Sequence, residues 1–149
     1  MGRRASFRAY RAMVNAIALT SRGGIDSSNR LLRDAIALDS GFAAAWAALG
    51  NNFLGARQAD SARFAFQTAL RFPERLTNPQ QYRLKGDIAY SLEHDIPGAI
   101  RWYDLYLTEV PRSIGGRNNR ALYLSAAGRY ADAAADLRTT IADAPFGPS

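Results

Sequence analysis

The stretch AAAWAALGNNFLGARQADSARFAFQTALRFPE, residues 43–74, contains two apolar patterns on either side of a short polar turn. The first pattern consists of Trp46, Leu49, Gly50 and Phe53, and the second consists of Ala62, Phe66 and Ala69. Spacings of three, four and seven residues place side chains on one face of a helix. The stretch therefore predicts two helices whose apolar faces meet, with small residues that allow a close approach.

The order of these residues is that of a known repeat. The first helix has the pattern W-x2-L-G-x2-Y, with Phe53 at the last position, and the second has A-x3-F-x2-A followed by Pro73. This pattern resembles a tetratricopeptide repeat (TPR), in which two antiparallel helices form a unit of about 34 residues. Such a hairpin cannot bury its apolar faces alone, so the resemblance implies neighbouring repeats.

The rest of the chain is in register with this repeat. Residues 9–42 form a first unit, 43–76 a second, 80–113 a third after three extra residues, and 114–147 a fourth. Pro111 and Pro145 close the last two units at the same position. We expect one all-α domain, residues 1–149, built as a right-handed α-solenoid of four TPR hairpins with about eight helices.

Capping residues indicate where several helices begin. Ser6 is a good N-cap for the first helix, and Asp26 or Ser27 for the second. Asn78 followed by Pro79 predicts the start of the third unit, because proline suits the first position of a helix. The polar helix that usually covers the end of a TPR array does not follow the fourth unit. We therefore expect a piece of a longer protein, or a fourth unit that packs on another chain.

Three segments support a narrower resemblance. The segments IALDSGFAAAWAALG at 36–50, RFPERLTNPQQYRLKGD at 71–87 and DIPGAIRWYDLYLTEVPR at 95–112 resemble the TPR region of bacterial membrane-anchored serine/threonine kinases and related regulators. The sequence has no glycine-rich loop with a strand lysine, no HRD and no DFG, so no kinase element is present. The resemblance implies the interaction or regulatory part of a signalling protein.

The net charge of +6 lies entirely at the N-terminal end. Residues 1–33 contain one acidic residue, Asp26, and the basic residues Arg3, Arg4, Arg8, Arg11, Arg22, Arg30 and Arg33. A basic end of this kind suits nucleic acid, an anionic membrane surface or an acidic protein. A solvated helix face with no ligand explains the same charges.

Composition narrows the classes of protein to which the chain can belong. The chain is 48% apolar and 21% charged, as in soluble globular proteins, and no apolar run approaches the length of a membrane helix. We recognise no signal peptide, so membrane insertion is not expected. The absence of cysteine excludes disulfides and leaves the compartment open. The cytoplasm is favoured, with an extracytoplasmic site if the parent protein is a membrane-anchored kinase.

Residues for catalysis are scarce. His94 is the only histidine, and its predicted place is a turn beside Asp95. Metal-ligand spacings are absent, and the Gly115-Gly116-Arg117 run has neither the strand nor the GK[ST] of a phosphate loop. We expect no enzyme activity, no cofactor and no metal site.

The TPR resemblance implies where a partner would bind. The first helix of each repeat lines the concave face of a TPR array, and the peptide-binding residues predicted there are Tyr10, Met13, Asn51, Leu54, Lys85, Asn118, Asn119 and Leu122, with Ile17 beside them. Asparagine amides can bond to an extended peptide backbone, and Lys85 can meet a carboxylate. Ordinary solvated helix positions are the alternative reading of each residue.

These observations predict a noncatalytic protein–protein interaction module that holds a peptide or partner segment on its concave face. Two alternatives stay open. One is a nucleic-acid-binding helical repeat that uses the arginine-rich first unit. The other is self-assembly into a homo-oligomer through the uncovered C-terminal repeat.

Overall fold

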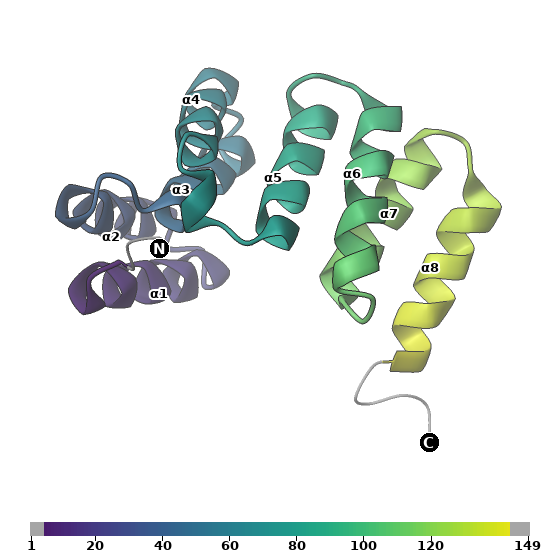
Figure 1. The fold of residues 1–149 in the computed structure, drawn as a ribbon, viewed down its shortest axis with the longest axis horizontal. Coiled ribbons are helices and arrows are strands. Elements are labelled where there is room, and N and C mark those ends of the chain that lie inside the picture. Colours follow the sequence, from purple (N-terminus) through teal and green to yellow (C-terminus); the bar gives the residue numbers. More distant parts are fainter. Residues whose placement is uncertain (1–4, 144–149) are drawn as a thin grey trace. The chain divides into compact units, whose positions relative to one another are not determined.

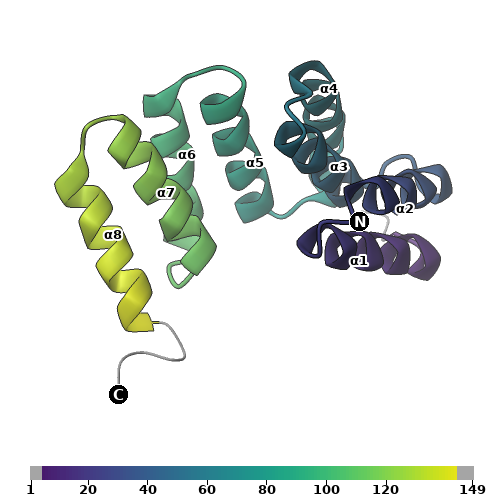
Figure 2. The same ribbon diagram turned by 180° about the vertical axis from the view of Figure 1, so that it is seen from behind.

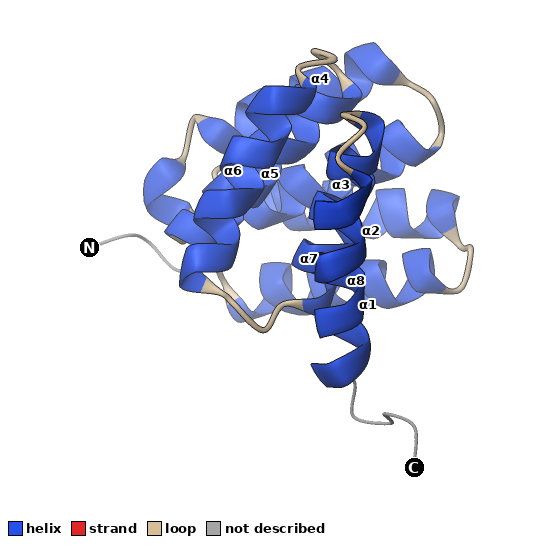
Figure 3. Ribbon diagram, turned by 90° about the vertical axis from the view of Figure 1, so that its right-hand side faces the viewer, coloured by secondary structure: helices blue, strands red, loops and turns tan. Residues whose placement is uncertain are grey.

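The structure is a computed structural model that describes residues 5–143. Within those residues it consists of eight α-helices and one short 3-10 helix, and Figure 3 shows helices joined by short connections with no strand. The chain divides into two compact units, Met1–Thr77 and Asn78–Ser149. Each unit contains two helical hairpins and is described separately.

The first unit contains α1 Phe7–Ser21, α2 Ile25–Leu38, α3 Ala43–Gly55, α4 Ala59–Leu70 and the 3-10 helix η1 Pro73–Arg75. Consecutive helices pair as antiparallel hairpins, α1 with α2 and α3 with α4 (Figure 1). α3 also packs against α2 and contacts α1, so the two hairpins share one core.

The predicted start of α1 agrees with the structure, and the predicted start of α2 differs from it. The Ser6 hydroxyl accepts a hydrogen bond from the Ala9 N–H, which confirms the predicted N-cap of α1. α2 begins at Ile25 instead of at Asp26 or Ser27, and its N-cap, Gly24, provides no side-chain bond. Ser28 is fully buried and bonds to other helices.

The second hairpin is held by the close approach of Gly50 to Phe66. A Cβ atom on Gly50 would overlap the ring carbons of Phe66, which is fully buried. Ala62 and Ala69, on either side of Phe66 in α4, are also fully buried. Small and aromatic residues therefore interlock here as the sequence predicts.

The connector after α4 is tied to the first unit. The extra residues expected near position 77 follow η1, and the Arg75 guanidinium pairs with the Asp39 carboxylate at 2.5 Å. Both side chains are largely buried, with 10% and 17% of their surface exposed. The ion pair joins η1 to the loop between α2 and α3.

The second unit contains α5 Asn78–Ser91, α6 Ile96–Glu109, α7 Ile114–Ala126 and α8 Tyr130–Asp143. These helices also form successive antiparallel hairpins, with α7 packed on both α6 and α8 (Figure 2). α5 begins at Asn78, as predicted. The Asp95 and Ser113 side chains cap α6 and α7 by accepting backbone N–H groups.

The third hairpin repeats the glycine–aromatic contact in a shifted register. A Cβ atom on Gly86 would lie 2.6 Å from the Tyr103 ring, so Gly86 occupies the place that Gly50 has in the second hairpin. The repeat bounds 80–113 would have put Asp87 at this position. The structure differs by one residue because the turn between Ser91 and Ile96 is one residue longer than that between α3 and α4. His94 adopts a positive φ of 56° in this turn.

Two ion pairs join the helices of the fourth hairpin. The Arg117 guanidinium bonds to the Asp143 carboxylate at 2.8 Å and to the Pro111 carbonyl. Arg120 donates to both carboxylate oxygens of Asp136, at 2.8 and 2.6 Å. The hydrogen bonds that Arg120 donates to Asp136 raise the pKa of Arg120, and the hydrogen bond that Arg117 donates to Asp143 lowers the pKa of Asp143. Charged side chains therefore join α7 to α8.

The all-α fold of four helical hairpins predicted from the sequence is confirmed. That the four repeats form a single domain stays a prediction. Arg3, Arg4 and the predicted end of the fourth repeat, residues 144–147, lie outside the described residues.

We predict that G50A destabilises the chain by about 1–3 kcal/mol, because a methyl group on α3 would collide with Phe66. G55A is the matched control in the same helix, since nothing lies within 4 Å of its added methyl group. It should be neutral or stabilising by up to about 1 kcal/mol. Urea denaturation measures both variants, and equal stabilities would contradict this account of the hairpin.

Candidate binding surface

The predicted surface residues of the first unit lie on α1 and α3. Tyr10 is 54% exposed and Ile17 48% exposed on α1, while Asn51 is exposed and Leu54 partly exposed on α3. Ile17 and Asn51 occupy the same position of successive repeats, 34 residues apart. α1 contacts α3, and we infer from the shared repeat position that Ile17 and Asn51 lie on one face of the unit.

A buried amide fixes the two helices at this end of the face. The Asn52 side chain is buried and donates to the Ser28 hydroxyl at 3.0 Å and to Asn29 Oδ1 at 2.8 Å. The Thr20 hydroxyl donates to Asn52 Oδ1 at 3.2 Å. A satisfied buried amide ties α1, α2 and α3 together in a defined register. The sequence pattern contained no signal for this network.

A continuous apolar stripe runs along the exposed side of α1. Phe7 is 75% exposed and Val14 44% exposed, at helical spacing from Tyr10 and Ile17. The Arg11 guanidinium lies 6.0 Å from the centre of the Phe7 ring. Val14 and Phe7 were not among the predicted residues, although their spacing of three and four residues from Tyr10 would have found them. We define the α1–α3 face as Tyr10, Val14, Ile17, Asn51 and Leu54.

Met13 differs from its predicted place. It is only 9% exposed and belongs to the core of the first unit with Ala9 and Ala16. The α-helical turn rotates Met13 toward α2 and leaves Val14 outside. Met13 therefore supports the α1–α3 face from beneath.

Lys85 also lies between helices. Its ammonium group is 4.8 Å from the centre of the Trp102 ring, which stacks on Tyr82 at 6.0 Å. An ammonium over an indole ring is attracted by the negative face of the ring. The one-residue shift in α5 explains this position, because it turns Lys85 toward α6.

The remaining predicted residues lie on α7. Asn118 is exposed and Leu122 is 53% exposed. Asn119 is partly buried, and its amide donates to the Tyr103 hydroxyl at 2.9 Å. Asn119 therefore joins α7 to α6, while Asn118 and Leu122 are available to a partner.

Asp87 is at the centre of a polar cluster in the second unit. Its Oδ1 accepts hydrogen bonds from the Tyr103 hydroxyl at 2.6 Å and from the Tyr123 hydroxyl at 2.9 Å. Burial raises the pKa of Asp87, and these bonds and Arg83 oppose the rise. Burial and the neighbouring carboxylate raise the pKa of both tyrosines. These hydrogen bonds link α5, α6 and α7.

The side chains that could bind a metal ion are dispersed in the described residues. No group of three or more histidine, cysteine or acidic side chains among them could hold a metal ion. His94 is exposed in its turn, as predicted. Across residues 5–143, none of the helices has the length and apolar character needed to span a lipid bilayer.

The structure is similar to solved TPR proteins. YrrB, a TPR protein with an unusual peptide-binding site, is 20% identical and matches with a TM-score of 0.61 over 92% of this chain and 69% of its own. A chain of the APC/C hetero-tetramer Cut9–Hcn1 is 18% identical, with a TM-score of 0.74 over 93% of this chain, which spans only 28% of that protein. MamA is 17% identical, with a TM-score of 0.61 over 91% of this chain and 77% of its own.

No protein-family model and no curated protein matches the sequence. The structural matches show that the chain has the TPR fold. The finer resemblance to kinase-associated TPR regions is not shown by them.

We predict a pH-dependent stability difference between the native chain and D87N. A raised pKa means that the folded state binds the Asp87 proton more tightly than the unfolded state does. The native chain should therefore gain stability relative to D87N as the pH falls from 7 toward about 4, near the ordinary aspartate pKa. Denaturant unfolding at several pH values measures this difference, and an opposite trend would contradict the assigned shift.

Proposed function

We propose that this chain is a noncatalytic protein-interaction module whose first unit binds a peptide segment on the α1–α3 face. The observation that carries the proposal is the exposed apolar stripe on α1, which includes Tyr10, Val14 and Ile17. Exposed apolar residues are common singly, but a row along one helix marks an interaction surface. Tyrosine is also enriched among the residues that dominate binding energy.

The charges beside the stripe favour an acidic partner. Arg8 and Arg11 are exposed on α1, and Arg22 is exposed at its end. Within residues 5–143, none of the three forms an ion pair with an acidic side chain. A segment that alternates apolar and acidic side chains would fill the stripe and meet these guanidinium groups.

Asn51 suits the backbone of such a segment. Its side-chain amide offers both a donor and an acceptor, which match a peptide N–H and C=O. Leu54, one turn further along α3, adds a partly exposed apolar contact. The peptide-binding site of YrrB supports this use of the fold by analogy.

A second, smaller surface on α7 includes Asn118 and Leu122. Asn119 and Lys85 support it from within the unit through Tyr103 and Trp102. The likeness of residues 36–50, 71–87 and 95–112 to kinase-associated TPR regions supports a regulatory role in a larger bacterial signalling protein.

We predict that I17A weakens peptide binding at least tenfold, a loss of about 1.4 kcal/mol in binding free energy. Peptides selected by phage display on the immobilised chain supply the ligand, and fluorescence anisotropy gives the affinity. L38A is the matched control, because Leu38 is 49% exposed on α2 and Ile17 is 48% exposed on α1. N51A should weaken binding as well, by a smaller factor.

Equal affinities of I17A and L38A for the selected peptides would place binding elsewhere. The nucleic-acid alternative is tested in the same way with single-stranded oligonucleotides. Affinity that falls steeply with salt and ignores I17A would favour nucleic acid, because released counterions dominate phosphate binding.

Self-association is a second candidate function, and one observation favours it. Leu137 on α8 is 44% exposed, whereas the residues at the same position of the preceding hairpins, Leu32, Phe66 and Tyr103, are at most 1% exposed. Tyr130 and Ile141 continue this apolar face at 70% and 60% exposure. In the third hairpin this position is Tyr103. Asn119 of α7, the first helix of the fourth hairpin, donates a hydrogen bond to its hydroxyl. A first helix of a second copy would cover the face of α8 in the same way.

We predict that light scattering detects a concentration-dependent dimer that L137S weakens. L105S is the control, because Leu105 on α6 is equally exposed, at 45%. A monomer at all concentrations, or equal weakening by L105S, would exclude association through α8.

A further inference from the structure

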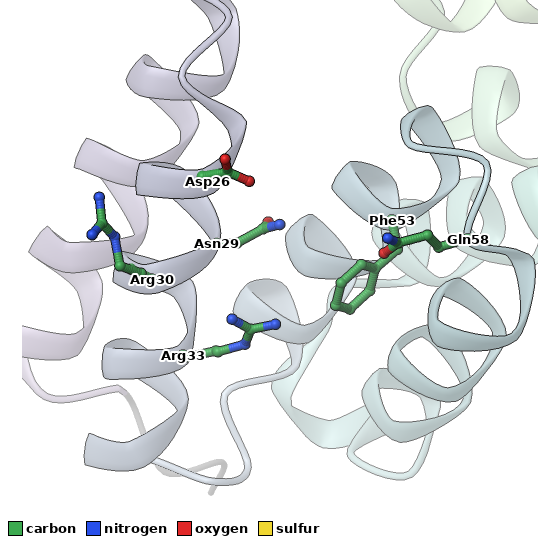
Figure 4. A pocket seen from close by; sticks show the side chains of 6 residues that line it. All are labelled: Asp26, Asn29, Arg30, Arg33, Phe53 and Gln58. Carbon is green, nitrogen blue, oxygen red and sulfur yellow. The ribbon is translucent and has the colours of Figure 1, made fainter.

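A cleft of about 480 Å³ opens between α2 and the end of α3. The residues that line it are Asp26, Asn29, Arg30, Arg33, Phe53 and Gln58. None of them belongs to the α1–α3 face as defined above, although Phe53 also lies on α3. Figure 4 shows Asn29 and Arg33 extending from α2 toward Phe53 and Gln58, whereas Arg30 extends away from them.

Arg33 is the cation that faces the cleft (Figure 4). In the part of the chain that the structure describes, its guanidinium forms no ion pair with an acidic side chain. Arg30 instead donates to the Ser27 hydroxyl at 3.0 Å. A guanidinium presents a planar pair of donors that matches a carboxylate, so Arg33 offers a site for one anionic group.

The Asn29 amide is held in a defined orientation. Its Oδ1 accepts from the buried Asn52 side chain at 2.8 Å, and Asn52 is itself bonded to Ser28. The NH2 group of Asn29 is therefore left to donate into the cleft, where it would meet a carbonyl or carboxylate oxygen. A donor fixed by a buried partner binds without losing much side-chain freedom.

The other residues that line the cleft favour some anions over others. Phe53 gives one apolar wall, and the Gln58 amide can bond to a peptide group. Asp26 places a negative charge in the same cleft and balances one of the two arginines. A singly charged group next to a peptide N–H fits this arrangement, whereas Asp26 would repel a doubly charged phosphate more strongly.

We propose that the cleft binds the carboxylate of an aspartate or glutamate side chain in a peptide, with Arg33 and Asn29 as its donors. An apolar neighbour in that peptide packs on Phe53, and a backbone N–H of the peptide donates to Asp26. The site goes beyond the proposed function, since its two donors, Arg33 and Asn29, lie on α2 and not on the α1–α3 face. A peptide can bind in the cleft even if none binds on the α1–α3 face, and a peptide can bind on that face even if none binds in the cleft.

The test uses the full chain and an acetylated, amidated peptide of alternating glutamate and phenylalanine, whose only carboxylates are side chains. Its glutamine counterpart is the neutral control. Amide shifts in ¹⁵N spectra report the site, and titration gives the affinity. R33Q removes the proposed donor, and R101Q is the matched control because Arg101 is exposed on α6, outside both the cleft and the α1–α3 face.

We predict amide shifts at residues 26–33 with the glutamate peptide, a five- to tenfold loss of affinity in R33Q and no change in R101Q. Equal binding of the glutamine peptide, or equal losses in R33Q and R101Q, would overturn the proposal. Tighter competition by inorganic phosphate than by acetate at equal ionic strength would also overturn it, because the site would then select phosphate.

Discussion

The hairpins of this chain depend on the close approach of a first helix to a large side chain on the second. Gly50 lies against Phe66 and Gly86 against Tyr103, at distances that leave no space for a Cβ atom. Such contact buries the aromatic ring fully and aligns the two helices along their length. The residues of the first helices that stay exposed, such as Asn51 on α3, remain for partners.

Polar groups then determine how successive hairpins join. Asn52 links three helices of the first unit, and Asp87 links three helices of the second through two tyrosine hydroxyls. A satisfied buried network specifies one register among many similar apolar packings. Arg120 has a comparable role in the fourth hairpin, where it pairs with Asp136 and Asp104. These links hold the exposed residues of α1, α3 and α7 in fixed positions.

The fold could be predicted because the TPR pattern in residues 43–74 reflects the contacts between helices. Small residues occur where the helix backbones approach closely, and aromatic residues fill the wider spaces between them. The register of α5 could not be predicted, since one extra residue in the turn before Ile96 cannot be located without a structure. Lys85 was therefore expected on the surface, although it lies over Trp102. Met13 and Val14 lie three and four residues from Tyr10, so helical periodicity admits both, and only their burial separates them. The cleft beside Arg33 depends on side chains from separate helices, which no local pattern relates.

The account's central claim is that α1 and α3 form the binding face of the first unit. The most direct measurement is a map of backbone amide shifts in the ¹⁵N-labelled chain on addition of a peptide selected for binding. The account predicts that the largest shifts fall at residues 10–17 of α1 and 51–54 of α3. Shifts confined to α4 or to residues 78–143 would contradict it.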